Sequence, residues 1–128
     1  MIQLPAFHLS IVQPIGYAHS LGFVDQVRYV RWQLRRLGAR VTVAKNRLRE
    51  DAVNLVFGAH LGFDPERLAR HTCVFVNLEQ LGEGGAQVSE DYLRLLRNCA
   101  VIDYDPHNVA AYAEDPADVP VIPLLHAP

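Results

Sequence analysis

Short apolar segments rich in β-branched residues alternate with helical patterns along this sequence, and this alternation limits the fold more than any other feature. The clearest apolar segment is 72–77, in which nearly every side chain is hydrophobic. A run of this kind is typical of a strand buried on both faces, as in a parallel sheet covered by helices. Five further strand candidates lie at 7–12, 40–44, 53–57, 100–104 and 119–123. The last of these contains two prolines, which restrict it to an edge strand or an extended tail.

Helical patterns separate these strands. Apolar residues recur at helical intervals between residues 21 and 37, and Gly38 stands where a C-terminal cap belongs. Three shorter helices are expected, one capped by Asp64, one capped by Ser89, and one opened by Pro106 that runs to about residue 113. The alternation predicts the α/β class: a single Rossmann-like domain with a mostly parallel sheet of about six strands and helices on both faces.

The length of the chain bounds the number of domains. With 128 residues it has enough material for one such core and too little for a second domain of comparable size. We therefore expect one domain over residues 1–128. The first residues lack the basic start of a signal peptide, and no apolar run reaches the roughly 18 residues that span a bilayer. The sequence predicts a cytoplasmic protein without a membrane span.

Charge and cysteine content exclude two classes of site. Residues 1–64 carry 8 Lys and Arg against 4 Asp and Glu, and residues 65–128 carry 4 against 10. Most arginines of the first half fall on or just after the helix at 21–37, where an exposed helical face explains them, so we expect no nucleic-acid partner. Cys73 and Cys99 form no C-x-x-C motif and have no paired histidine spacing, which argues against a zinc site or a redox dithiol. We expect neither a metal nor a cofactor.

Polar residues follow the expected strands at their carboxyl ends, where open α/β sheets bind ligands. The set comprises Gln13, Tyr17, His19 and Ser20 after the first strand, Asn46 after the second, His60 after the third, Asn77, Glu79 and Gln80 after the fourth, and Asp103, Asp105, His107 and Asn108 at or after the fifth. Because the carboxyl ends of parallel strands share one edge, these side chains are expected to line one rim.

The residues on this rim each have more than one interpretation. His19 is a ligand contact or a turn residue, and His60 is a ligand contact or a hydrogen-bonded structural histidine. Glu79 is a general base, an acceptor for sugar hydroxyls, or a carboxylate that orders a loop. The run 103–108 is typical of helix capping, with catalysis as the alternative. The segment 16–22 contains glycines without the G-x-G-x-x-G pattern, so dinucleotide binding is not expected.

Several of these motifs, taken in order, resemble a known family. They are Leu37-Gly38-Ala39, Lys45-Asn46, the run Asn54 to Leu61, Val76-Asn77-Leu78-Glu79-Gln80, and Asp103-Tyr104 with Asn108. The set is similar to the N-terminal half of bacterial GT-B-type glycosyltransferases, which occur in polysaccharide and protein glycosylation clusters. The similarity covers most of residues 8–125.

The resemblance implies a Rossmann-like domain that faces a second such domain across a cleft. In that family the second domain binds the nucleotide sugar and the first mostly receives the acceptor. This chain ends about where the family enters the second domain, so we expect an acceptor-side half that needs a partner chain for sugar transfer. Glu79, His19 and His60 are then the candidates for activating the acceptor hydroxyl. Candidate substrate contacts are Tyr17, Ser20, Asn46, Asn77, Gln80, Asp103 and Asn108.

A second hypothesis is a non-catalytic binding or protein-interaction module that retains the glycosyltransferase-like fold. Under this hypothesis the apolar segment 121–125 and the surface around it dock on another protein or on a second copy of the chain, because an exposed apolar edge seldom stays solvated. The partners expected from the sequence are therefore a second glycosyltransferase subunit, a homo-oligomer, or a sugar or glycan acceptor.

Overall fold

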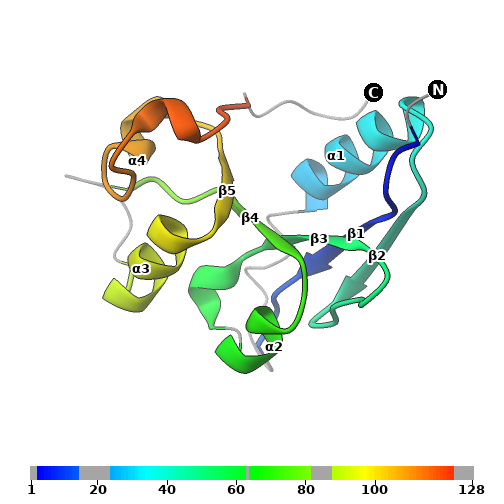
Figure 1. The fold of residues 1–128 in the computed structure, drawn as a ribbon, viewed down its shortest axis with the longest axis horizontal. Helices are drawn as coiled ribbons and strands as arrows, with labels where there is room; N and C mark the ends of the chain where they lie inside the picture. Colours follow the sequence, from blue (N-terminus) through cyan, green and yellow to red (C-terminus); the bar gives the residue numbers. More distant parts are fainter. Residues whose placement is uncertain (1–2, 15–23, 63, 82–87, 123–128) are drawn as a thin grey trace.

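Five parallel strands form one sheet in the order β2-β1-β3-β4-β5 (Figure 1). The computed structural model describes residues 3–14, 24–62, 64–81 and 88–122. The strands are β1 (Phe7–Ile11), β2 (Val41–Lys45), β3 (Val53–Phe57), β4 (Cys73–Asn77) and β5 (Ala100–Asp103). The expected parallel α/β architecture is confirmed, with five strands in place of about six. The segment at 119–123 contributes one isolated bridge, between Asp103 and Val121, within its described part.

Helices connect most of the strands. The described helices are α1 (Val24–Arg36), α2 (Pro65–Ala69), α3 (Glu90–Asn98) and α4 (Pro106–Val109), and two 3-10 segments lie at Ala59–Leu61 and Pro116–Asp118. The helix α4 is shorter than the sequence predicts, since its helical turns end at Val109 and the chain continues in turns to Tyr112.

The predicted caps are confirmed. After α1, the Gly38 amide donates to the Arg35 carbonyl and the Ala39 amide to the Leu34 carbonyl, which is the Schellman pattern. Gly38 has a φ of 90°, a conformation that favours glycine. The side chains of Asp64, Ser89 and Asp105 accept from the first-turn amides of α2, α3 and α4.

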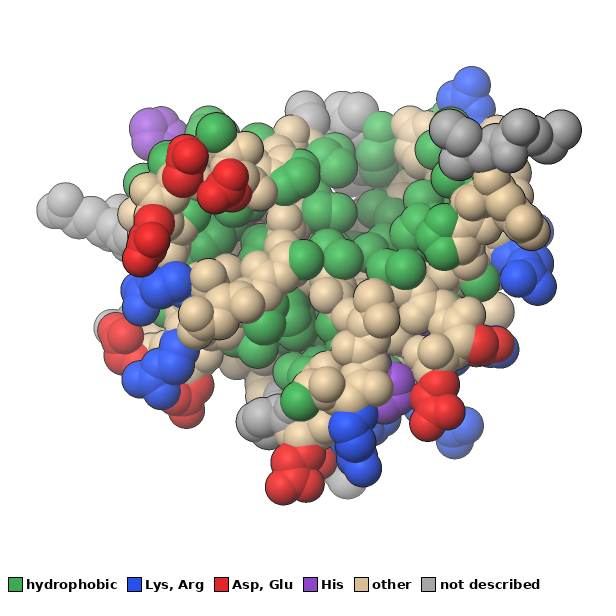
Figure 2. Space-filling model, in the orientation of Figure 1, with side chains coloured by type: hydrophobic (Ala, Val, Ile, Leu, Met, Phe, Trp, Pro, Cys, Tyr) green, Lys and Arg blue, Asp and Glu red, His purple; other side chains and the backbone are tan. Residues whose placement is uncertain are grey.

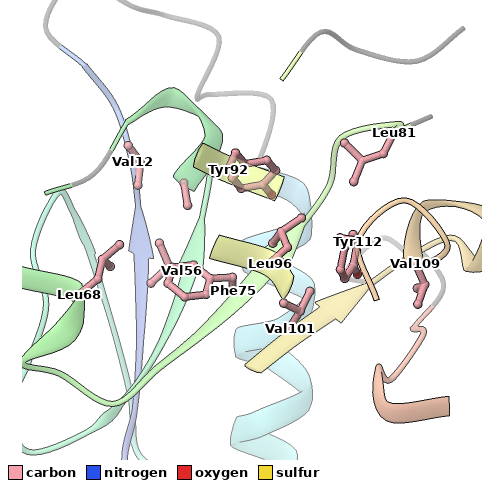
Figure 3. Packing of buried hydrophobic residues seen from close by; sticks show 11 residues of the cluster. Val12, Val56, Leu68, Phe75, Leu81, Tyr92, Leu96, Val101, Val109 and Tyr112 are labelled. Atoms are coloured by element: carbon pink, nitrogen blue, oxygen red, sulfur yellow. The ribbon is translucent and has the colours of Figure 1, made fainter. Parts of the chain in front are cut away.

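The two faces of the sheet carry separate hydrophobic clusters. On one face Val27, Val30 and Leu34 of α1 pack against strand residues such as Leu9 and Phe57. On the other face the larger cluster joins α2, α3 and the region of α4 to the sheet, and Figure 3 shows the side chains that form it. Successive residues of β3 and β4 point to different clusters, as the pleat of a strand requires.

The segment from 46 to 52, which joins β2 to β3, contains no helix. An extended crossover cannot satisfy its own backbone groups, so side chains of the central strands supply the missing partners. His8 Nε2 donates to the Arg47 carbonyl at 3.0 Å. The Asn54 amide accepts from the Arg49 N–H at 2.8 Å and donates to the Arg49 carbonyl at 2.9 Å. The buried polar side chains of His8 and Asn54 therefore have hydrogen-bond partners in this crossover.

Within the described part of the chain, no helix has both the length and the apolar character needed to cross a bilayer.

Candidate functional site

A histidine and a carboxylate meet at the carboxyl edge of the sheet. His60 lies in the 3-10 segment after β3, which begins after a left-handed turn at Gly58 with φ of 87°. Glu79 lies two residues beyond β4, the neighbouring strand. The distance from His60 Nε2 to Glu79 Oε1 is 2.9 Å, and the two side chains are 15% and 25% exposed. The pair is therefore partly desolvated and still reachable from solvent.

The chemistry of the two groups fixes where the imidazole proton lies. An ionised carboxylate only accepts hydrogen bonds, so the 2.9 Å contact with Glu79 favours the tautomer that carries its hydrogen on Nε2. Burial lowers the pKa of His60 below its usual 6.5, and the negative charge of Glu79 opposes this in part. The neutral, basic form of His60 is therefore the one that prevails near pH 7.

A buried polar network lies next to this pair, centred on Asp103 at the end of β5. The Asp103 carboxylate is 1% exposed and accepts five hydrogen bonds. The donors are the Asn77 amide, the Asn108 amide, the Tyr112 hydroxyl, and the backbone N–H groups of Tyr104 and Asp105. A buried charge needs such compensation, and here hydrogen bonds supply it without a bound arginine or lysine among the described residues.

The network also holds the backbone of Glu79. The Asn77 and Asn108 amide groups each donate to the Glu79 carbonyl at 3.0 Å. Asn77 Oδ1 accepts from the Glu79 N–H at 3.3 Å and from the Tyr92 hydroxyl at 2.8 Å. Burial raises the pKa of Tyr92, and the charges of Asp103 and Glu79 add to this, so the phenol stays a donor. Both polar groups of the Glu79 peptide unit are thus bonded to buried side chains.

The loops after β1 and β2 are joined by Asn46. Its side chain accepts from the Gln13 N–H at 2.7 Å and donates to the Gln13 carbonyl at 2.8 Å. Arg67 of α2 donates to the Asn46 carbonyl at 3.0 Å. This link ties neighbouring loops of the same edge together and uses both ends of the Asn46 amide.

The structure therefore brings the predicted rim residues together in two groups. One consists of His60, Glu79, Asn77, Asp103 and Asn108, and the other of Gln13 and Asn46. Gln80 is exposed beside Glu79, and Asp105 caps α4 through the His107 N–H. Tyr17, His19 and Ser20 lie outside the described residues. Contact of any of these side chains with a substrate stays a prediction.

Sequence reasoning missed Tyr92 and Tyr112. Both are buried, and their hydroxyls complete the network around Asn77 and Asp103. A signal was present, because Tyr92 lies four residues before Leu96 on the apolar face of α3 and Tyr112 lies three residues after Val109. A tyrosine in such a position buries its ring, and its hydroxyl then requires a partner.

Among the described residues, no group of three or more His, Cys, Asp or Glu side chains is arranged to hold a metal ion. Comparison with known proteins adds no relative to this picture, since no family model, curated protein or solved structure matches the chain.

Proposed function

We propose that this chain is the acceptor-side domain of a glycosyltransferase-like enzyme, in which His60 is the base that activates an acceptor hydroxyl and Glu79 orients it. The observation that supports this proposal is the 2.9 Å contact between His60 Nε2 and Glu79 Oε1. Removal of a proton from a sugar hydroxyl requires a base within hydrogen-bond reach that is neutral before the reaction. His60 has this state because burial lowers its pKa.

The pair lies where a ligand of an α/β domain is expected, beyond the carboxyl ends of β3 and β4. Transfer would proceed by attack of the acceptor oxygen on the sugar carbon of a nucleotide-sugar donor, with the acceptor proton passing to the His60 imidazole and the nucleoside diphosphate leaving. In this proposal a second domain or partner chain, similar to the donor half of the GT-B enzymes, holds the donor. The cytoplasmic location expected from the sequence remains part of the proposal.

Binding of an acceptor by the chain alone tests this function. We expect free monosaccharides and methyl glycosides to shift the NMR signals of His60, Glu79 and the exposed neighbour Gln80. The variants His60→Gln and Glu79→Gln should weaken that binding, whereas His71→Gln, just before the amino end of β4, should not. UDP-glucose should leave the melting temperature unchanged, because the donor site lies elsewhere. Sugar transfer by the purified chain alone, or sugar-induced shifts confined to other regions, would contradict the proposal.

A second candidate function, a protein-interaction module, is favoured by an apolar groove of about 350 Å³ beside α1. Its walls include Tyr29 and Leu34 of α1, Val76 and Ile102 of the sheet, and Ile122 of the last described segment. In the described part of the chain α1 is the one helix that contributes to the hydrophobic cluster on this face. Apolar side chains of β4 and β5 therefore line this groove, and Figure 2 shows hydrophobic side chains gathered in the middle of the molecule.

The occupant that fits this groove best is a second copy of the chain. The exposed arginines Arg28, Arg31, Arg35 and Arg36 lie on α1, and the exposed acids Glu114, Asp115 and Asp118 lie near the other end of the sheet. In Figure 2 acidic side chains gather to the upper left of the apolar patch, and basic side chains lie on both sides of it. A twofold arrangement would place the basic side of each copy against the acidic side of the other.

Sedimentation velocity over a range of concentrations tests the dimer. We expect the dimer fraction to rise with concentration and to fall with added salt. Ile122→Asp should abolish it, whereas Val43→Asp should not, although Val43 on the edge strand β2 is similarly exposed, at 41% against 47%. A monodisperse monomer at the highest concentration would contradict the dimer.

A further inference from the structure

We infer that Asn108 is a positioning residue for the His60–Glu79 pair, acting through the backbone of Glu79, with Asp103 as the buried anchor. The catalytic role of the pair rests on the proposed function, whereas the positioning itself is inferred from hydrogen bonds within this chain. Asn108 is fully buried and reaches the pair from α4, a helix that follows the next strand of the sheet.

Asn108 makes three hydrogen bonds that together determine where the chain runs after β4. Its amide group donates to the Glu79 carbonyl at 3.0 Å and to Asp103 Oδ1 at 3.0 Å. Its oxygen accepts from the Leu81 N–H at 2.7 Å. The residues on both sides of Gln80 are thereby held from one side chain, which leaves the Glu79 carboxylate directed at His60.

The same network supports the histidine. The ring of Tyr92 contacts the ring of His60 edge-on, and the Tyr92 hydroxyl donates to Asn77, which in turn binds Asp103 and the Glu79 backbone. Asp103 accepts its five hydrogen bonds in a buried position, so its orientation is strongly determined. The two members of the pair thus come from different loops and share one anchor.

The chain offers a matched control for Asn108. Tyr112 donates to the same carboxylate, Asp103, at 2.8 Å, and within the described residues its hydroxyl makes no bond to Glu79. Tyr112→Phe and Asn108→Ala therefore both remove a hydrogen bond of Asp103, and of the two only Asn108→Ala removes a bond to the Glu79 backbone. A general weakening of the network would affect the two variants alike.

The electrostatic coupling between Glu79 and His60 is the quantity to measure. The His60 pKa is followed by NMR, with and without Glu79→Gln, in the wild-type chain and in each variant. Loss of the Glu79 charge should lower the His60 pKa in the wild type, because that charge raises it. Asn108→Ala should remove about half or more of this drop, and Tyr112→Phe should retain it, as in a double-mutant cycle. The other titratable groups near the pair, Tyr92 and Asp103, are unchanged in the wild type and in the two variants, so they do not differ between the comparisons.

The outcomes separate the two proposals. If Glu79→Gln leaves the wild-type His60 pKa unchanged, the pair does not act as a unit, and the proposed function fails with it. If the drop is present and is the same with and without Asn108→Ala, the positioning role is overturned and the proposed function stands.

Two further measurements cover the case in which Asn108→Ala does not fold. Asn108→Leu keeps the branched shape of the side chain and removes the same bonds, so it should show the same reduced coupling. In the wild type, the side-chain amide hydrogens of Asn108 should exchange with D₂O as slowly as the backbone amides of β4. Exchange of these hydrogens within the dead time of the measurement would overturn the inference without any variant.

Discussion

The ring of Tyr92 meets the ring of His60 edge-on, with 5.7 Å between the ring centroids and 64° between the planes. The same tyrosine donates its hydroxyl to Asn77 at 2.8 Å. One residue of α3 therefore supports the histidine with its ring and the buried network with its oxygen. These two contributions can be separated by substitution, because phenylalanine keeps the first and loses the second.

Tyr92→Phe is expected to lower the free energy of unfolding by about 1–2 kcal/mol, since it leaves the buried Asn77 oxygen with a weaker set of donors. Tyr92→Leu should cost more, because it also loses the ring contact with His60. Urea unfolding measures both. As a control, Tyr29→Phe should change stability by less than about 0.5 kcal/mol, because within the described residues the Tyr29 hydroxyl bonds only to Gln33 on the same, half-buried helix face. Equal losses at positions 29 and 92 would contradict this account.

Asn46 combines a left-handed backbone, with φ of 58°, and a side chain that binds the Gln13 backbone twice. Asn46→Gly should lose the two hydrogen bonds and keep the backbone conformation without strain. Asn46→Ala should lose the bonds and add a strain of about 1 kcal/mol. Thermal unfolding of the three proteins should therefore rank them Asn, Gly, Ala. An alanine variant more stable than the glycine variant would show that the positive φ is not kept in solution.

Ser10 is completely buried in the central strand β1, and its hydroxyl has no hydrogen-bond partner among the described residues. Removal of an unsatisfied buried hydroxyl should stabilise the protein, so we expect Ser10→Ala to raise the free energy of unfolding by up to about 1 kcal/mol. Denaturant unfolding with an unchanged m-value measures this gain. A loss of more than about 1 kcal/mol would reveal a partner for the hydroxyl, because the serine would then be contributing a bond.

Stability should fall as the pH drops below about 6.5, the ordinary pKa of histidine. Burial lowers the pKa of His8 and of His60; the charge of Arg49 adds to the effect at His8, where the Arg47 carbonyl and Asp51 oppose it. The unfolded chain therefore binds protons in a range where the folded chain does not, and the free energy of unfolding decreases through that range. Above this range these two histidines should no longer make the free energy of unfolding depend on pH.

The variant His8→Gln should reduce this acid dependence, and His107→Gln, which changes an exposed histidine, should leave it as in the wild type. Chemical unfolding at several pH values between 5 and 8 provides the comparison. An identical pH profile for His8→Gln and the wild type would mean that His8 takes up its proton equally in both states.

The fold could be predicted from the sequence because the residue patterns that indicate each helix and strand are local. Each element is indicated by residues within a few positions of it. Examples are the apolar run of β4, the cap at Ser89 before α3 and the glycine at position 38 after α1. A local feature also limits the sixth strand candidate. Pro120 lacks the N–H that a strand ladder needs, and the described part of that segment forms a single bridge.

Only part of the candidate site could be predicted from the sequence. The parallel sheet required His60 and Glu79 to lie at the same edge, and the sequence suggested both. The contact between them depends on Asn77, Asn108 and Tyr92, each of which makes a hydrogen bond to a residue 15 to 29 positions away along the chain. Sequence spacing does not reveal which polar residue is turned inward to bind another. Asn77, Asp103 and Asn108 were therefore predicted as ligand contacts, and the structure adds a second role for them as a buried support.

The helix-free crossover from β2 to β3 has a consequence for the order in which the chain assembles. A helical connection can form early because it closes its own hydrogen bonds, but this one takes its partners from His8 on β1 and Asn54 on β3. It acquires its conformation only when those two strands are already paired. The edge strand β2 is therefore expected to join late in folding, and hydrogen exchange in the native state should open it before the rest of the sheet.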